Sequence, residues 1–184
     1  MVTDLSIAPH TSLPKPRMGQ PWGVSRPGIS LVKTTARISE VFRVFDGSIL
    51  LQALFMEFTT AASNHTCDLS CVFDSDAGGD RVIASLVTVQ NSAVGDFVYA
   101  ELDGTALVKA ATGTGLIYGV FNRGVGTATD TAASVFGYGI PLTAGGIDLV
   151  LGSNALTTGI ITMTCIYTPL IEGASLVAED MVLS

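Results

Sequence analysis

Short apolar runs closed by turn residues recur along most of this 184-residue chain, and their spacing restricts the fold more than any other feature. Between residues 38 and 168 the runs follow one another at intervals of about 8 to 14 residues, bounded by Gly, Asp, Asn, Ser or Pro. Such intervals leave no room for the helices that connect parallel strands. The pattern therefore predicts an all-β fold, an antiparallel β-sandwich with a jelly-roll-like body.

The longest apolar segment, residues 38–62, predicts two strands joined by a turn. Residues 38–45 and 49–58 are separated by Asp46-Gly47-Ser48, where Gly can adopt the positive φ that hairpin turns need. As a strand, residues 49–58 are mostly apolar on both faces, which is typical of a strand in the interior. Leu, Ala, Met and Glu also favour a helix here. Because Thr59-Thr60 and the nearby Gly favour the strand, we interpret the segment as a β-hairpin.

Further strand-like runs follow this segment, and they bring the expected total to about nine or ten strands. Asp103-Gly104 is a two-residue hairpin signal between two of these runs. The expected strands are residues 67–73, 81–90, 97–102, 105–110, 116–121, 134–142, 147–151 and 160–168.

Proline content and charge divide the chain into three parts. Residues 1–34 hold five of the seven Pro and show no periodicity, so we expect an extended, basic arm. Residues 35–170 are expected to form the sandwich body, and residues 171–184 a second extended tail. Up to Arg37 the chain has five basic residues against Asp4, a net charge of +4, so the overall charge of −7 leaves −11 for the rest.

The arm carries the residues that we expect to bind a partner. The only Trp of the chain lies in the arm, which suggests that part of the arm packs against another surface. Only 14% of all residues are charged, against about 25% in a typical soluble domain, which suggests that partners cover part of the surface. We therefore expect a homo-oligomer, with a trimer favoured. Nucleic acid is a weaker choice, because the arm has few excess charges and no other interleaved aromatic residues. The candidate partner-binding residues are Lys15, Arg17, Trp22, Arg26, Ile29 and Leu31.

The sequence predicts no membrane span and no disulfide framework. No apolar stretch reaches the roughly 20 residues needed to cross a bilayer, and Asp4 and Pro9 stand where a signal peptide has its apolar region. The three cysteines, Cys67, Cys71 and Cys165, are an odd number, so they cannot all pair with one another. We expect them to be buried as small apolar side chains.

The sequence contains no recognisable catalytic motif. It lacks a Gly-x-Ser-x-Gly elbow and a phosphate-binding loop, and neither His10 nor His65 has zinc-like spacing. The acidic loop at residues 74–80 resembles the start of a calcium loop, but Gly78 and Ser85 stand where carboxylate or amide ligands belong. We interpret it as a solvated turn, with cation binding left as an open alternative. We expect no enzyme activity, no catalytic residue, no cofactor and no metal.

Residues 41–61, VFRVFDGSILLQALFMEFTTA, are followed by Gly-rich strands and a Thr-rich last strand. In this pattern of apolar, Gly-rich and Thr-rich strands, residues 38–168 resemble small virion structural proteins of tailed bacteriophages, in particular capsid decoration or cement proteins. The resemblance implies a non-enzymatic protein of the capsid that oligomerises, binds the major capsid protein or another virion protein, and stabilises the shell. The alternatives are a head-to-tail or tail ring component, and a jelly-roll module that binds glycans or a receptor.

Overall fold

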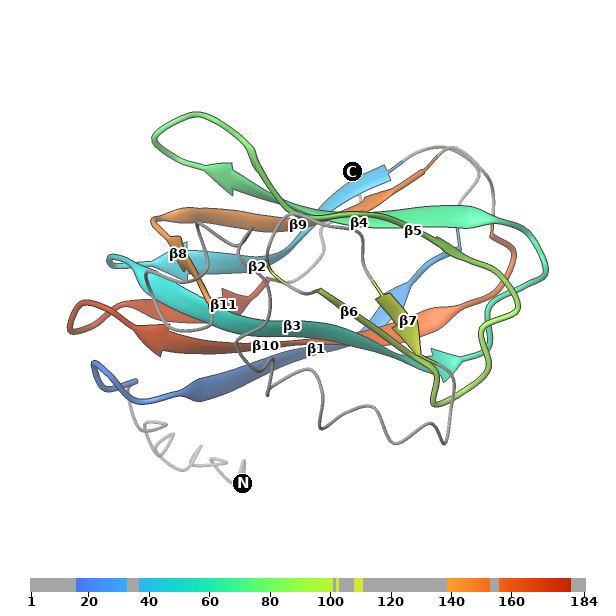
Figure 1. The fold of residues 1–184 in the computed structure, drawn as a ribbon, viewed down its shortest axis with the longest axis horizontal. Helices are drawn as coiled ribbons and strands as arrows, with labels where there is room; N and C mark the ends of the chain where they lie inside the picture. Colours follow the sequence, from blue (N-terminus) through green and yellow to red (C-terminus); the bar gives the residue numbers. More distant parts are fainter. Residues whose placement is uncertain are drawn as a thin grey trace, which may run out of the picture.

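In the described parts of the chain, eleven strands form two antiparallel sheets that pack face to face in the computed structural model (Figure 1). The structure describes residues 16–32, 37–100, 102, 108–110, 139–152 and 156–179. One sheet has the strand order β1-β10-β3-β6-β7, with β8 also paired to β3, and the other has the order β11-β2-β9-β4-β5. The bounds are β1 (Trp22–Ser30), β2 (Arg37–Phe45), β3 (Ile49–Thr60), β4 (Cys67–Ser75), β5 (Arg81–Val89), β6 (Phe97–Ala100), β7 (Val108–Ala110), β8 (Ile140–Leu142), β9 (Gly145–Leu151), β10 (Ile160–Pro169) and β11 (Ser175–Ala178).

The strand pairs are nested about the connection between β4 and β5. β4 pairs with β5, β3 with β6, β2 with β9 and β1 with β10, all in antiparallel register. These eight strands therefore form one antiparallel ribbon that is wrapped on itself, and β10 then pairs with β3 while β9 pairs with β4. This arrangement is a jelly roll. It confirms the predicted all-β sandwich.

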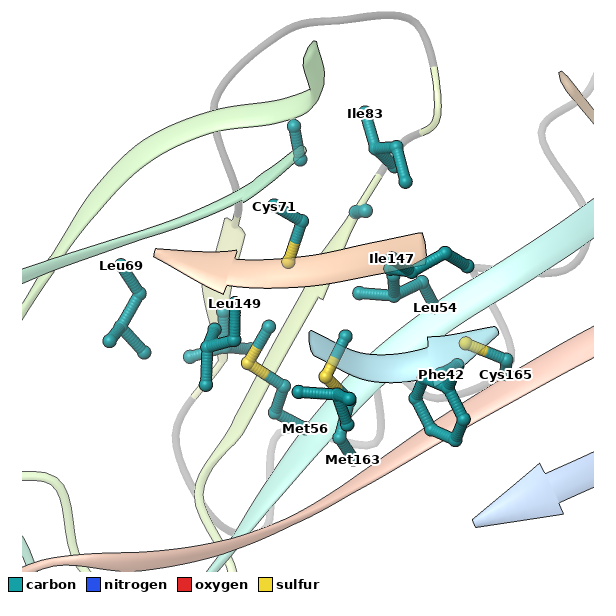
Figure 2. Packing of buried hydrophobic residues seen from close by; sticks show 14 of the residues in the cluster. Phe42, Leu54, Met56, Leu69, Cys71, Ile83, Ile147, Leu149, Met163 and Cys165 are labelled. Carbon is teal, nitrogen blue, oxygen red and sulfur yellow. The ribbon is translucent and has the colours of Figure 1, made fainter. Parts of the chain in front are cut away.

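The core lies between the two sheets and is built by alternation along each strand. In β10, Ile161, Met163, Cys165 and Tyr167 are buried, whereas the residues between them are partly exposed. Figure 2 shows side chains from both sheets that point into the same space. The residues labelled there are Phe42, Leu69, Cys71, Ile83, Ile147 and Leu149 from one sheet and Leu54, Met56, Met163 and Cys165 from the other.

The predicted hairpin of β2 and β3 is wrong, although both strands are present. β2 pairs with β9 and β11, whereas β3 belongs to the other sheet. The turn between them, with Asp46 at φ 57° and Gly47 at φ 142°, carries the chain from one sheet to the other. A positive φ suits either kind of turn, so the local sequence does not distinguish a hairpin from a crossing between sheets.

Most of the other predicted strands are confirmed. Those at residues 67–73, 81–90, 147–151 and 160–168 correspond to β4, β5, β9 and β10. The pairing expected around Asp103-Gly104 is also confirmed, since β6 pairs with β7 and Phe97 lies opposite Ala110. Of residues 134–142 only the last few are described, with β8 among them, and residues 116–121 lie outside the described parts of the chain.

Part of the predicted arm and part of the predicted tail are strands of the sandwich. β1 forms an edge of one sheet, with Trp22 opposite Tyr167, and its register shifts between Arg26 and Ile29, where Pro27 and Gly28 stand. An edge tolerates proline because one side of the strand needs no ladder donor. β11 likewise forms an edge beside β2. Residues 22–30 and 175–178 are therefore part of the body, not of extended arms.

The three cysteines are free and buried, as expected from the sequence. Burial raises the pKa of the Cys71 thiol to about 12, and the carboxylate of Asp148 adds to this shift. Burial also raises the pKa of Cys165 well above its ordinary value. Both thiols therefore stay neutral and pack as small apolar groups.

Gly145, the first residue of β9, is expected to tolerate no side chain. Its φ is +153°, and an added Cβ would collide with the Asp74 carbonyl oxygen and lie 2.9 Å from Phe73 Cζ. We expect Gly145→Ala to lower the free energy of unfolding by about 3 kcal/mol or more, since backbone strain and overpacking combine. Urea denaturation monitored by circular dichroism measures this loss.

Gly78 provides the matched control for this prediction. It also has a positive φ, +89°, but no atom lies within 4 Å of an added Cβ. Gly78→Ala should therefore cost only the backbone strain, about 1 kcal/mol. Equal losses in the two variants would contradict the collision at Gly145.

Candidate interaction surfaces

The structure places the predicted partner-binding residues in different environments. Arg17 is exposed, and Lys15 lies outside the described residues. Ile29 and Leu31 are 1% and 0% exposed and belong to the hydrophobic core of their own chain. These two side chains therefore offer no surface to a partner, which corrects their assignment. A Pro-rich segment without periodicity does not predict a strand, so its apolar residues suggest contacts with a partner.

Trp22 and Arg26 are half-buried on the inner side of β1. Trp22 packs partly against the core, and its register partner on β10 is Tyr167. The indole Nε1 of Trp22 is buried and has no hydrogen-bond partner in the described structure. Burial raises the pKa of Tyr167, and a hydrogen bond with the backbone of Leu176 partly offsets this. Trp22 therefore contributes to closing the sandwich near the β1 and β11 edges.

Several exposed apolar side chains gather at the end of the sandwich where two turns meet. The backbone N–H of Leu170 donates to the Ser48 carbonyl, 2.9 Å away, and the N–H of Gly19 donates to the Pro169 carbonyl, 3.0 Å away. These bonds hold residues 16–20, the β2–β3 turn and the β10–β11 turn together. The exposed side chains of this turn-end patch are Met18, Phe45, Leu170 and Ile171. Their clustering depends on the sheet order, so the sequence did not show it.

A second group of exposed apolar side chains lies on the outer face of the β2–β9–β4–β5 sheet. Ile38, Val82 and Leu86 are 67%, 50% and 57% exposed. Ile38 pairs with Val150 on β9, and Val82 pairs with Val72 on β4. Val72 and Val150 are partly exposed as well. Clustered apolar exposure of this kind is typical of interaction surfaces.

Carboxylates occupy the neighbouring part of the same face. Glu40 on β2 lies opposite Asp148 on β9. The Arg43 guanidinium donates to Glu40 Oε2 at 2.8 Å and to Asp76 Oδ1 at 2.6 Å. A Cβ at Gly146 would collide with the Glu40 side chain, so this glycine leaves the space in which Glu40 lies.

The charges around Asp148 act on its protonation. Partial burial raises the pKa of Asp148, and the carboxylates of Glu40, Asp74 and Asp80 raise it further, while Arg43 opposes the shift. These carboxylates, contributed by β2, β4 and the β4–β5 loop, therefore repel the charge of Asp148 on β9. We call the outer face with these carboxylates and the exposed apolar side chains of β2 and β5 the acidic sheet face.

The loop at residues 74–80 does not form a cation cage in the described structure. Asp76 pairs with Arg43, and the Asp76 backbone N–H donates to the Ala144 carbonyl at 3.1 Å. Among the residues that the structure describes, no group of three His, Cys, Asp or Glu side chains is placed to hold a metal ion. The geometry therefore gives the calcium alternative no support.

Aromatic side chains mark the outer face of the other sheet. Phe55 on β3 lies directly opposite Tyr99 on β6, and Phe97 lies opposite Glu57 in the adjacent position. All four side chains are partly exposed. Such a cross-strand aromatic pair stabilises a sheet. No local pattern marks these residues, because their proximity depends on the pairing of β3 with β6.

We compared the chain with protein families, curated proteins and solved structures. No protein-family model and no curated protein matches the chain. Within the described residues no helix could span a membrane.

Solved structures of infectious bursal disease virus are similar to this chain over much of its length. The structure of the Gx strain matches with 8% identity and a TM-score of 0.27, over 95% of this chain and 43% of the viral chain. The T=1 particles derived from the virus match with 10% identity and a TM-score of 0.19, over 97% and 45%. The VP2 subviral particle matches with 11% identity and a TM-score of 0.18, over 88% and 43%.

The chain spans less than half the length of these viral chains. Because these TM-scores are low, we base no statement about fold or function on this similarity. The jelly roll rests on the strand pairing of this chain alone.

Asp148→Asn is expected to stabilise the fold at neutral pH. Because the native pKa of Asp148 is raised, the native state holds a proton more tightly than the unfolded state, and wild-type stability falls as pH rises from the ordinary value of 3.8 through the native pKa. The neutral amide avoids this loss. We expect a gain of less than about 1 kcal/mol at pH 7 that shrinks as the pH falls.

Urea denaturation across this pH range measures the effect. Glu172→Gln, in the exposed β10–β11 turn, removes the same charge outside the acidic sheet face and serves as the control. If Asp148→Asn gains no more than Glu172→Gln at pH 7, repulsion within the carboxylate group is refuted.

Proposed function

We propose that this chain is a non-enzymatic structural protein of a virion, a capsid decoration or cement protein that oligomerises and stabilises the shell. The observation that carries the proposal is a jelly roll with apolar side chains exposed on a sheet face and at one end. Jelly rolls occur in viral capsid and lectin domains. Exposed apolar groups such as Ile38 and Met18, 67% and 62% exposed, suit contacts with neighbouring copies. The low charged fraction, 14%, supports the same interpretation.

The proposed contacts use the surfaces described above. Because β1 is part of the body, the arm is limited to the residues before it, with Lys15 and Arg17 as its contact residues. The turn-end patch adjoins this arm, because the Gly19 N–H donates a hydrogen bond to the Pro169 carbonyl at the same end of the sandwich. The partners in this proposal are further copies of the chain, a trimer being favoured, and the major capsid protein or another virion protein.

Light scattering of the purified chain tests the oligomer. We expect a mass of about three times 19.0 kDa, since the exposed apolar surfaces are covered in a closed assembly. A monomer at all concentrations would rule out the oligomer. In particles, copy number separates a decoration protein, present in hundreds, from a ring of about a dozen subunits.

A glycan-binding module is the second candidate, and the Phe55–Tyr99 pair favours it. Rings of this kind can stack on sugar faces, and Glu57, opposite Phe97, supplies a nearby hydrogen-bond acceptor. A glycan array of the full chain tests this function, with Tyr99→Ala as the variant and Phe45→Ala, at the other sheet, as the control. Binding that only Tyr99→Ala abolishes would favour this candidate over a purely structural role.

A further inference from the structure

The acidic sheet face combines two properties that together restrict its partner. In the isolated chain Ile38, Val82 and Leu86 keep half or more of their surface exposed. The face therefore presents uncovered apolar groups on both β2 and β5, at opposite sides of β9 and β4. The upper layer in Figure 1 shows these four strands side by side.

The charge of this face is strongly one-sided. Among the side chains that the structure describes, six carboxylates lie on it or at its end, and the Arg43 guanidinium lies among them. Arg43 is already engaged by Glu40 and Asp76. Asp74 and Asp80 are exposed and lie close enough to Asp148 to shift its protonation. The six carboxylates are Glu40, Asp68, Asp74, Asp76, Asp80 and Asp148.

This charge disfavours a contact of the face with its own copy. In an isologous dimer the same patch meets itself, so the carboxylates of two copies would be brought together. Like charges that meet across an interface weaken it. The face instead matches a partner that is apolar and basic, in a heterologous contact.

The chain itself supplies such a segment. Residues 1–17 include the apolar residues Val2, Leu5, Ile7 and Leu13, and Lys15 and Arg17 against Asp4 give them a net charge of +1. Fifteen extended residues reach about 50 Å. A five-stranded sheet is only about 24 Å wide, so this segment is long enough to cross the face of a neighbouring molecule.

We propose that the acidic sheet face binds residues 1–17 of a second copy of this chain, with apolar side chains of the segment on Val82, Leu86 and Ile38 and with Lys15 and Arg17 on the carboxylates. This inference rests on the proposed oligomer and names the surfaces that join its subunits. Because the two surfaces differ, each copy gives one segment and receives another. Such head-to-tail contacts close into rings or extend into lattices.

A charge-swap series tests the pairing by analytical ultracentrifugation. Asp74→Lys with Asp80→Lys changes the receiving face, and Lys15→Glu with Arg17→Glu changes the segment. Each pair of substitutions should raise the dissociation constant of the assembly at least about tenfold, since like charges then meet. Combining all four substitutions should restore most of the affinity, because the attraction is rebuilt with opposite sign.

Glu57→Lys, on the outer face of the other sheet, is the matched control for Asp74→Lys alone, because both make the same change in net charge. It should leave the assembly unchanged. Raising the salt concentration should weaken the wild-type assembly and reduce the difference between the variants. Circular dichroism of every variant checks that the sandwich remains folded.

A synthetic peptide of residues 1–20, added to the wild-type chain, provides a test without substitutions. It should compete for the face and dissociate the assembly. An oligomer that resists both the peptide and the face substitutions would overturn this inference and leave the proposed structural function intact. A wild-type chain that is monomeric throughout would instead overturn the proposed oligomer itself.

Discussion

The packing of two sheets through their inner faces is the interaction on which the rest of this structure depends. β3 and β10 form a long antiparallel ladder from Ile49 opposite Pro169 to Thr60 opposite Ile160. Their alternate residues, such as Met56 and Met163, point into the same core (Figure 2). Burying such side chains contributes roughly 1.5–3 kcal/mol each, so the register of the ladder is fixed by which residues must face inward.

This constraint determines what each edge of the sandwich can do. β1 closes one sheet despite Pro27, because an edge strand tolerates an interrupted ladder. β5, at the far edge of the other sheet, has two shifts in its register with β4. Proline and bulges both discourage pairing between edges of different molecules. Contacts between copies are therefore better served by faces and loops than by strand addition.

The outer faces of the two sheets can differ in composition because their side chains do not pack in the core. One carries the Phe55–Tyr99 pair, and the other carries the carboxylates around Asp148 beside exposed Val and Leu side chains. Charge on a sheet face is costly where carboxylates are crowded and partly buried, and Arg43 relieves only part of this repulsion. A protein keeps such a face at some cost to stability, which is consistent with a role in binding.

The sequence by itself determined the class of fold and most of the strands, because alternation and turn residues act within a few positions of one another. The run at residues 160–168 predicts a strand, and β10 confirms it with buried residues at every second position. Only the tertiary structure decided that β2 and β3 lie in different sheets and that Ile29 and Leu31 belong to the core. The grouping of Glu40, Asp74 and Asp148 was equally beyond the sequence, since these residues meet through strand pairs more than 30 positions apart. Such long-range pairing follows from how all inner faces fit together, and no local pattern encodes it.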